Sequence, residues 1–418
     1  MSFQQGLSGL NATSKNLDVI GNNIANANTY GAKSARAEFA DLYAGAISGT
    51  GSSQVGIGTR VATVAQQFTQ GNVTATDNGM DLAVNGAGFF QLHSTDGSLV
   101  YSRNGQFKVD RDGYIINNQQ QRLLGYQADS QGVIIPSAAV EIQLPTAGID
   151  PQVTERISME MNLDSRSDVT LPAAGNAIDF SDPTTYNNAT SVSVYDVKGQ
   201  EVALTYYFQK TASDTWNVYV AANGTSVLSD GSGVPQPVTQ MVFPITGTAP
   251  TAPVGNVTLD VPAATDGSYE AIAGIALDVS GATQYGTGFS VTDMVQNGYA
   301  PGQMVGLQIE QTGVVTARYS NGQTKAAGQI ELASFRNLNG LQALGGNAWS
   351  STFASGNPIV GVPGGGNFGA LSSGALEESN VDLTAELVNM ITAQRIYQAN
   401  AQTIKTQDQV LQTLVNLR

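Results

Sequence analysis

The chain has 418 residues, 41% of them hydrophobic and only 12% charged, with 47 glycines, no cysteine and a formal net charge of −15 at pH 7. This length allows about two to four domains, and the scarcity of charge together with abundant glycine favours a β-rich, turn-rich body. Eighteen basic residues spread along an acidic chain argue against a nucleic-acid partner, and the lack of cysteine excludes disulfides and thiolate zinc sites.

Residues 1–30 are predicted to form an amphipathic helix, because apolar side chains recur at helical spacing. The first residues lack a basic segment, an apolar run and a small-residue cleavage site, so we expect no Sec signal peptide. No stretch of the sequence approaches 18 apolar residues, so we expect no membrane insertion. The positions assigned to the apolar face of this helix are Leu7, Leu10, Leu17, Ile20 and Ile24.

Residues 31–75 are rich in Gly, Ser, Thr and Gln, and they are predicted to be a linker with some extended structure. Residues 361–374 have a similar composition. Each terminal helix is therefore expected to join the body through a flexible segment.

A first β domain is predicted from residues 76–147 together with residues 296–374. Short alternating runs separated by turn dipeptides predict an antiparallel meander after residue 89, and residues 305–335 repeat the pattern. The turn dipeptides are Asp96-Gly97, Asn104-Gly105, Asp112-Gly113 and Asn321-Gly322.

Residues 148–295 are predicted to be a second β domain, inserted into the first. This segment holds 16 Asp and Glu against 4 Lys and Arg, so it carries −12 of the net charge. A domain that stays soluble on the outside of an assembly would have this composition, and so would an ordinary acidic domain. The expected fold is mainly β, with two nested β domains and paired N- and C-terminal helices in a coiled coil.

The C-terminal residues 375–418 complete the helical domain with the strongest heptad pattern of the chain. Ser379 followed by Asp382 resembles a capping box, so the helix is predicted to begin at Ser379. Spacing alone leaves two interpretations equally open: a stripe buried within one chain, or a stripe shared with neighbouring subunits. The seam positions assigned to assembly are Leu383, Leu387, Met390, Tyr397, Ile404, Leu411 and Val415.

No constellation of residues indicates catalysis, a cofactor or a metal. The single histidine, His93, lies in a predicted strand, and the chain has no G-x-S-x-G motif. Gly364–Gly369 matches G-x-G-x-x-G without the strand–turn–helix context that phosphate binding requires. Asp110–Gly113 resembles part of a calcium loop but lacks the bidentate Glu, so a hairpin turn is expected.

Two terminal motifs resemble the signatures of flagellar rod and hook proteins. At the N-terminus they are residues 8–12 (Ser-Gly-Leu-Asn-Ala) and 17–26 (Leu-Asp-Val-Ile-Gly-Asn-Asn-Ile-Ala-Asn). At the C-terminus the similar stretch runs over residues 379–406, and residues 86–90 and 101–107 are similar to the first β domain of the family. An inserted domain of this size is typical of hook proteins rather than of the shorter distal rod proteins.

The resemblance implies a non-enzymatic subunit that polymerises with itself into a curved tube and acts as a universal joint between rod and filament. It implies inner layers of terminal helices and outer layers of β domains. It also implies export through the flagellar type III apparatus without a cleaved signal, with location in the extracellular hook. The implied partners are the hook cap protein, the distal rod protein and the hook–filament junction protein, with no cofactor.

Two other functions remain open from the residues alone. A distal rod or other axial flagellar protein would share the terminal motifs. A carbohydrate-binding adhesin would need exposed aromatic side chains on one sheet face, and Tyr206–Phe208 is the cluster to inspect. Alternation along a half-buried strand explains that cluster more simply.

Overall fold

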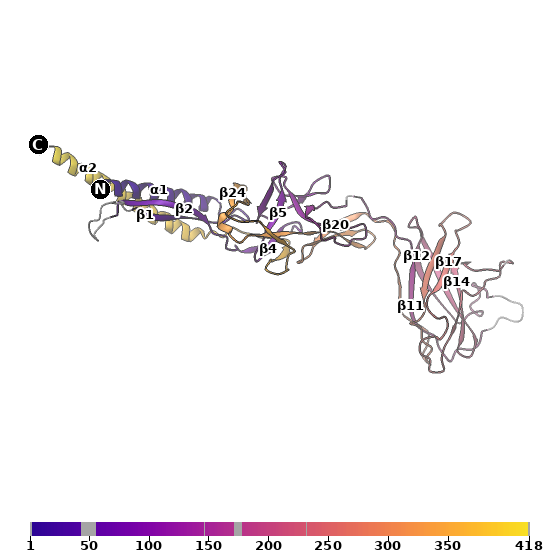
Figure 1. Ribbon diagram of the computed structural model, residues 1–418. Coiled ribbons are helices and arrows are strands. Elements are labelled where there is room, and N and C mark those ends of the chain that lie inside the picture. The colour runs from indigo at the N-terminus through magenta and orange to yellow at the C-terminus, as the bar shows by residue number, and fades with distance from the viewer. Residues whose placement is uncertain (1, 43–55, 146, 171–177, 231, 417–418) are drawn as a thin grey trace. The chain divides into compact units, whose positions relative to one another are not determined.

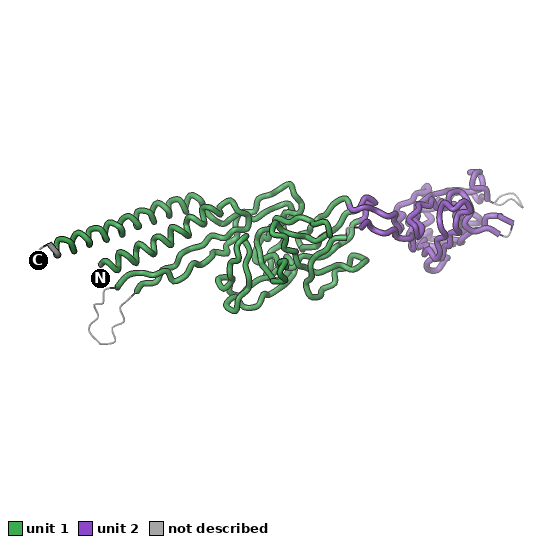
Figure 2. Tube along the Cα trace, turned by 90° about the horizontal axis from the view of Figure 1, so that it is seen from above, with its two compact units in different colours: residues 1–146, 305–318, 324–418 green, residues 147–304, 319–323 purple. Residues whose placement is uncertain are grey.

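The computed structural model describes residues 2–42, 56–145, 147–170, 178–230 and 232–416. They form two compact units, one of residues 1–146, 305–318 and 324–418 and the other of residues 147–304 and 319–323 (Figure 2). Both terminal helices belong to the first unit, and strands dominate the remainder (Figure 1). The expected mainly β fold with N- and C-terminal helices is confirmed, whereas the domain boundaries drawn from the sequence stay predictions.

The terminal helices α1 (Ser2–Ala25) and α2 (Leu383–Asn416) lie side by side and antiparallel. A two-stranded ribbon of β1 (Ala35–Leu42) and β2 (Gly58–Gln66) packs along α1 (Figure 1). The segment 31–75, expected to be a linker with some extended structure, contains these strands of eight and nine residues and the short strand β3 (Val73–Ala75).

Helix α2 begins at Leu383, so the predicted start at Ser379 is wrong. The side chain of Asp382 is the N-cap, because its Oδ1 accepts hydrogen bonds from the backbone N–H of Thr384 (2.9 Å) and Ala385 (3.1 Å). The hydroxyl of Ser379 accepts instead from Val381 N, in the turn before the helix. With 34 residues, α2 is about 51 Å long.

The β body of the first unit is a 13-stranded sheet with two small antiparallel pairs beside it. Strands from the two halves of the chain pair with one another in it: β9 pairs with β22, β5 with β23, and β6 with β25. The strands from the first half are β3 (Val73–Ala75), β4 (Leu82–Asn85), β5 (Phe89–His93), β6 (Leu99–Ser102), β7 (Lys108–Val109), β8 (Ile115–Ile116), β9 (Arg122–Gln127) and β10 (Val140–Glu141). Those from the second half are β20 (Met304–Ile309), β21 (Val314–Tyr319), β22 (Thr324–Ile330), β23 (Leu332–Ser334), β24 (Gln342–Gly345), β25 (Ala348–Ser350), β26 (Ile359–Gly361), β27 (Ala370–Ser373) and β28 (Ala375–Glu377), with a 3-10 turn η1 (Leu338–Gly340).

The predicted meander is confirmed at Asp96-Gly97 and Asp112-Gly113 and is wrong at Asn104-Gly105. Strands β5 and β6 pair across the first turn, and β7 and β8 across the second. After β6 the chain instead folds against Leu82, whose N–H donates to Gly105 O. A Cβ at Gly105 would lie 1.6 Å from Leu82 O, so only glycine fits this approach.

The second unit is a β structure with one apolar core between a four-stranded and a five-stranded sheet. Tyr206 and Phe208 are fully buried in that core, and the ring of Tyr207 is covered by Phe180 and Tyr186. The aromatic cluster considered for an adhesin is therefore occupied by the chain's own side chains. The strands are β11 (Arg156–Asn162), β12 (Asn188–Tyr195), β13 (Glu201–Ala212), β14 (Thr215–Ala222), β15 (Thr225–Ser226), β16 (Thr239–Val242), β17 (Val257–Val261), β18 (Ile272–Asp278) and β19 (Ser290–Gln296).

Candidate assembly surface

The seam between α1 and α2 is tight because small residues of α1 face α2. A Cβ added to Gly6 would lie 3.1 Å from Ile404, and one added to Gly9 would lie 2.9 Å from the Asn400 amide. At the other end of the seam, Asn23 donates to Glu386 Oε1 at 2.9 Å. These contacts fix the antiparallel register over almost the whole of α1.

Residues of α1 that were predicted to carry packing are mostly shielded. Ile20 is buried, while Leu10, Leu17 and Ile24 are half-buried. Leu7 differs from them, since 44% of its side chain is exposed. It therefore belongs to the outer surface of the helix pair.

The side of α2 that meets α1 is rotated from the predicted seam. Met390 and Ile404, two of the predicted seam positions, are half-buried, but the buried residue between Met390 and Tyr397 is Ala393. Likewise Glu386, not Leu387, turns toward α1. Every second residue that faces α1 therefore lies one position before the predicted seam residue, a rotation of about 100° around the helix. At Glu386 a polar contact to α1 takes the place of the predicted contact of Leu387.

This rotation leaves an apolar stripe on the outside of α2. Leu383, Leu387, Val388 and Ile391 are each 40–58% exposed, and we call these four residues the α2 stripe. They recur at helical spacing over the first three turns, so they share one side of the helix. Large contiguous apolar surface on a soluble chain indicates an interaction site.

The C-terminal end of α2 has no cover from α1. Because Gly6 lies opposite Ile404 in an antiparallel pair, residues beyond about 409 pass the start of α1. Leu411 is half exposed here, and Tyr397 is 37% exposed within the paired part. The side chain of Val415 lies outside the described residues, so its predicted role stays a prediction.

Asn23 joins three elements, and it was not among the residues predicted from the sequence. Its amide accepts from Ala35 N (2.9 Å) and donates to Ala35 O (2.8 Å), and it also donates to Glu386 on α2. Asn380 acts similarly just before α2, accepting from Ser34 N at 2.7 Å and donating to Gln67 O at 2.7 Å. Both amides hold the base of the ribbon. The sequence feature that could have pointed to them is their place in the Asn-rich terminal motifs.

A buried ion cluster of Lys33, Arg103 and Glu377 connects the helical layer to the β body. The carboxylate of Glu377 accepts hydrogen bonds from Lys33 Nζ at 2.5 Å and from Arg103 Nη1 at 3.1 Å. All three side chains are at most 7% exposed. The backbone N–H of Gly71 also donates to Glu377, at 3.0 Å. The cluster therefore ties together segments that precede the ribbon, follow it and lead into α2.

The charge balance of this cluster is uneven, with two cations for one carboxylate. Burial lowers the pKa of Lys33, and the hydrogen bond and charge of Glu377 oppose that change. Burial likewise lowers the pKa of Arg103, against the effect of Glu377. Glu377 is thus the group on which the stability of both buried cations depends.

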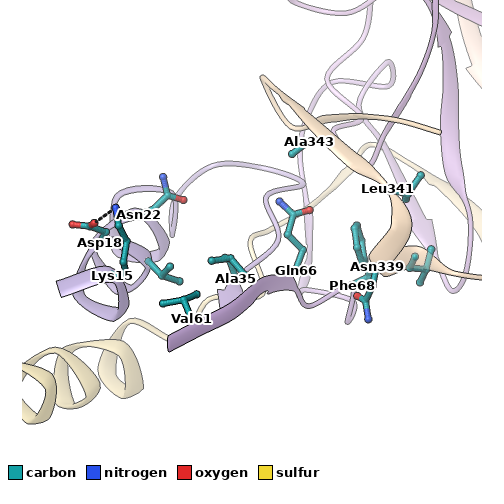
Figure 3. A pocket seen from close by; sticks show the side chains of 13 residues that line it. Lys15, Asp18, Asn22, Ala35, Val61, Gln66, Phe68, Asn339, Leu341 and Ala343 are labelled. Atoms are coloured by element: carbon teal, nitrogen blue, oxygen red, sulfur yellow. Dashed lines mark hydrogen bonds and ion pairs between the residues drawn. The ribbon is translucent and has the colours of Figure 1, made fainter. Parts of the chain in front are cut away.

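A cavity of about 650 Å³ opens between α1, the ribbon and the turn before β24 (Figure 3). Its apolar lining includes Val61 and Val64 of β2, Phe68 and Leu341. The ion pair of Lys15 with Asp18, 3.2 Å long, lies at the α1 side. The cavity is large enough to admit a side chain of another molecule.

The residues tested for chemistry have structural roles. His93 contacts Glu141 at 2.7 Å on the half-exposed sheet surface, and Asp110 closes a turn by accepting from Asp112 N and Tyr114 N. Gly364–Gly369 lies in the turns between β26 and β27, away from any helix start. Among the described residues, no group of acidic, His or Cys side chains could hold a metal, and no helix has the length and apolarity to cross a bilayer.

Family models for flagellar proteins match four parts of the chain. The flagellar basal body protein FlaE D2 domain matches residues 162–299, and the flagellar hook protein FlgE/F/G D1 domain matches residues 83–150. The flagella basal body rod protein matches residues 3–33, and the flagellar basal body rod FlgEFG protein C-terminal matches residues 372–417.

Similar proteins extend over the full chain. Flagellar hook protein FlgE of Escherichia coli K12 is 44% identical over 424 residues, with all of both chains covered, and that of Borreliella burgdorferi is 34% identical over all of this chain and 99% of its own. The crystal structure of Helicobacter pylori flagellar hook protein FlgE2 matches 73% of this chain with a TM-score of 0.53 and 14% identity, a likeness of fold. The chain belongs to the flagellar hook protein family.

Proposed function

We propose that this chain is the structural subunit of the bacterial flagellar hook, assembling with copies of itself into a curved tube that passes torque from rod to filament. The α2 stripe carries the proposal, because all four of its apolar side chains are 40–58% exposed in the single chain. The family is one of structural hook proteins, and the full-length identity supports the same role here.

In this proposal the helical domain of residues 1–30 and 375–418 forms the inner layers, and the two β domains form the outer layers. The assembly contacts are the apolar positions predicted from the sequence, with the exposed ones among them (Leu7, Leu383, Leu387, Tyr397 and Leu411) facing other copies. The ion cluster at Glu377 transmits force from helices to β body, since it joins Lys33, between α1 and β1, to Arg103 of the β body and to Glu377 just before α2.

The finer partners follow from the family. We include contacts with the hook cap protein, the distal rod protein and the hook–filament junction protein, and passage through the flagellar export apparatus without a cleaved signal. A chain without cysteine suits such export, because no disulfide has to be reduced or reformed. The proposed location is the hook, outside the cell.

The test is substitution of Leu387 by Asp in the full-length chain, followed by sedimentation and electron microscopy under polymerising conditions. Leu387 is 48% exposed, so the variant should fold and melt like the parent, but burial of the new carboxylate between copies should abolish polymers. Leu99→Asp, at an equally exposed leucine of β6, is the matched control and should polymerise. Normal polymers from Leu387→Asp would refute assembly through the stripe.

A further inference from the structure

The chain enters the second unit twice, once more than an inserted domain requires. Residues 147–304 form the body of that unit, and residues 319–323 belong to it as well (Figure 2). Residues 319–323 are the turn of the β21–β22 hairpin, whose strands pair within the 13-stranded sheet of the first unit. We call this turn the strap, because one hairpin has its strands in the first unit and its turn in the second.

The strap is hydrogen-bonded to the last residues of the body of the second unit. The backbone N–H of Ser320 donates to Gln303 O at 2.8 Å, and the N–H of Gln303 donates to the Ser320 hydroxyl at 3.1 Å. Asn321 Nδ2 donates to Ala300 O at 2.7 Å. The approach is close, since a Cβ added to Gly302 would lie 2.8 Å from Asn321 Cγ.

The segment that the strap contacts is also where the chain returns to the first unit. Gly302 and Ile149 exchange backbone hydrogen bonds of 2.8 and 3.2 Å, so the returning chain lies beside the outgoing chain. A Cβ added to Gly148 would lie 2.4 Å from Gly302 O, so this pair is tightly packed too. The outgoing chain, the returning chain and the strap are therefore hydrogen-bonded neighbours.

The strap is held by polar contacts rather than by apolar burial. Tyr319 is its one buried residue. Three of the other four are exposed: Ser320, Gly322 and Gln323. A segment with few buried apolar contacts opens locally at a low free energy, so the strap can detach while both units stay folded.

We propose that the strap is a releasable restraint on the motion of the second unit against the first, with Asn321 as the residue that locks it. With the strap bound, the outgoing chain, the returning chain and the hairpin all restrain the second unit. With the strap detached, the two chain connections alone remain and the second unit turns more freely. The inference goes beyond the proposed function, because it concerns the single chain and is tested without any polymer.

Asn321→Asp removes the lock and preserves the turn. The remaining oxygen still accepts from Gln323 N, as Asn321 Oδ1 does at 3.1 Å, but the donor to Ala300 O is lost and an oxygen takes its place. Asn223→Asp is the matched control, in the turn between β14 and β15. Asn223 accepts from Ala203 N at 3.0 Å, and among the described residues its amide donates no hydrogen bond, so the same substitution costs it no contact.

The measurement is the distribution of distances between two spin labels, one on each unit, in single full-length chains. Because the chain has no cysteine, Leu99→Cys in the first unit and Ile245→Cys in the second take the labels at positions 44% and 97% exposed. The distribution should be broader with Asn321→Asp than in the parent, and unchanged with Asn223→Asp. Hydrogen exchange of the Ser320 amide should be about fivefold faster with Asn321→Asp, as expected for loss of one hydrogen bond.

A second variant guards against a general loss of stability. Ser320→Ala removes the acceptor for Gln303 N alone, and it should broaden the distribution while urea unfolding of both units stays as in the parent. An unchanged width for Asn321→Asp and Ser320→Ala would overturn the restraint, and equal broadening by Asn223→Asp would do the same. Unchanged exchange of the Ser320 amide in Asn321→Asp would overturn the assignment of Asn321 as the lock. None of these results bears on polymerisation, so the proposed function stands or falls separately.

Discussion

Replacing Glu377 by Gln should destabilise the first unit by about 3–5 kcal/mol. The substitution removes the one carboxylate that Lys33 and Arg103 share, and all three side chains lie at most 7% exposed. Loss of one partner from a buried ion pair typically costs this amount, because the remaining charges are left without compensation. Backbone acceptors persist for both cations, at Thr69 O and Gly86 O, which places the expected value toward 3 kcal/mol.

The two tryptophans allow the effect to be assigned to one unit. Trp349 lies in the first unit and Trp216 in the second, and both are buried. In a Trp216→Phe background, fluorescence during urea unfolding reports on the first unit. In a Trp349→Phe background it reports on the second unit, whose transition should not move.

Two variants complete this experiment. Glu378→Gln changes a neighbouring half-buried carboxylate that forms no ion pair among the described residues, so it should alter stability by less than about 0.5 kcal/mol. Lys33→Met should cost less than Glu377→Gln, because it leaves one cation facing one carboxylate. A loss below about 1 kcal/mol for Glu377→Gln, or the reverse order of the two, would refute the assignment of Glu377 as the centre of the cluster.

Two further predictions concern polar contacts of the first unit. Asn23→Ala should expose the seam end of α1 by removing three hydrogen bonds, at about 1 kcal/mol each, and hydrogen exchange should show faster exchange in α1 but not in the β body. Burial raises the pKa of Glu331 above its usual 4.5, against the opposing hydrogen bond from the hydroxyl of Tyr126, so its ionisation favours the unfolded chain. Stability from this group is therefore full below pH 4.5 and falls as the pH rises through the folded pKa. Glu331→Gln should be more stable than the parent in urea at pH 7 and no more stable at pH 4; a less stable variant at pH 7 would contradict this.

The sequence predicted what depends on local periodicity. Repeated apolar spacing gave both terminal helices, and Asp-Gly turns gave two hairpins. The predictions of strand pairing were wrong where segments distant in the sequence compete for the same strand. Strand β6 takes β25 as its second neighbour, from almost 250 residues away, and no local pattern encodes that choice.

The orientation of α2 was missed for a similar reason. A heptad pattern marks which residues are apolar, but not which of two overlapping stripes meets the partner helix. Glycines on α1 and the Asn23–Glu386 hydrogen bond decide the matter here, and they turn Leu387 outward. The buried ion cluster could not be predicted either, because its residues are far apart in the sequence. Lys33 and Arg103 are separated by 70 positions, and Arg103 and Glu377 by 274.

Cysteine accessibility at Leu387 tests most directly whether copies assemble through the α2 stripe. The chain has no native cysteine, so Leu387→Cys supplies a single reactive thiol at a half-exposed position. Maleimide labelling would be timed on the monomer and on the polymer, with Ile245→Cys as an exposed reference in the second unit. The account predicts rapid labelling of both thiols in the monomer and protection of the Leu387→Cys thiol alone in the polymer. Equal labelling of that thiol in monomer and polymer would contradict it.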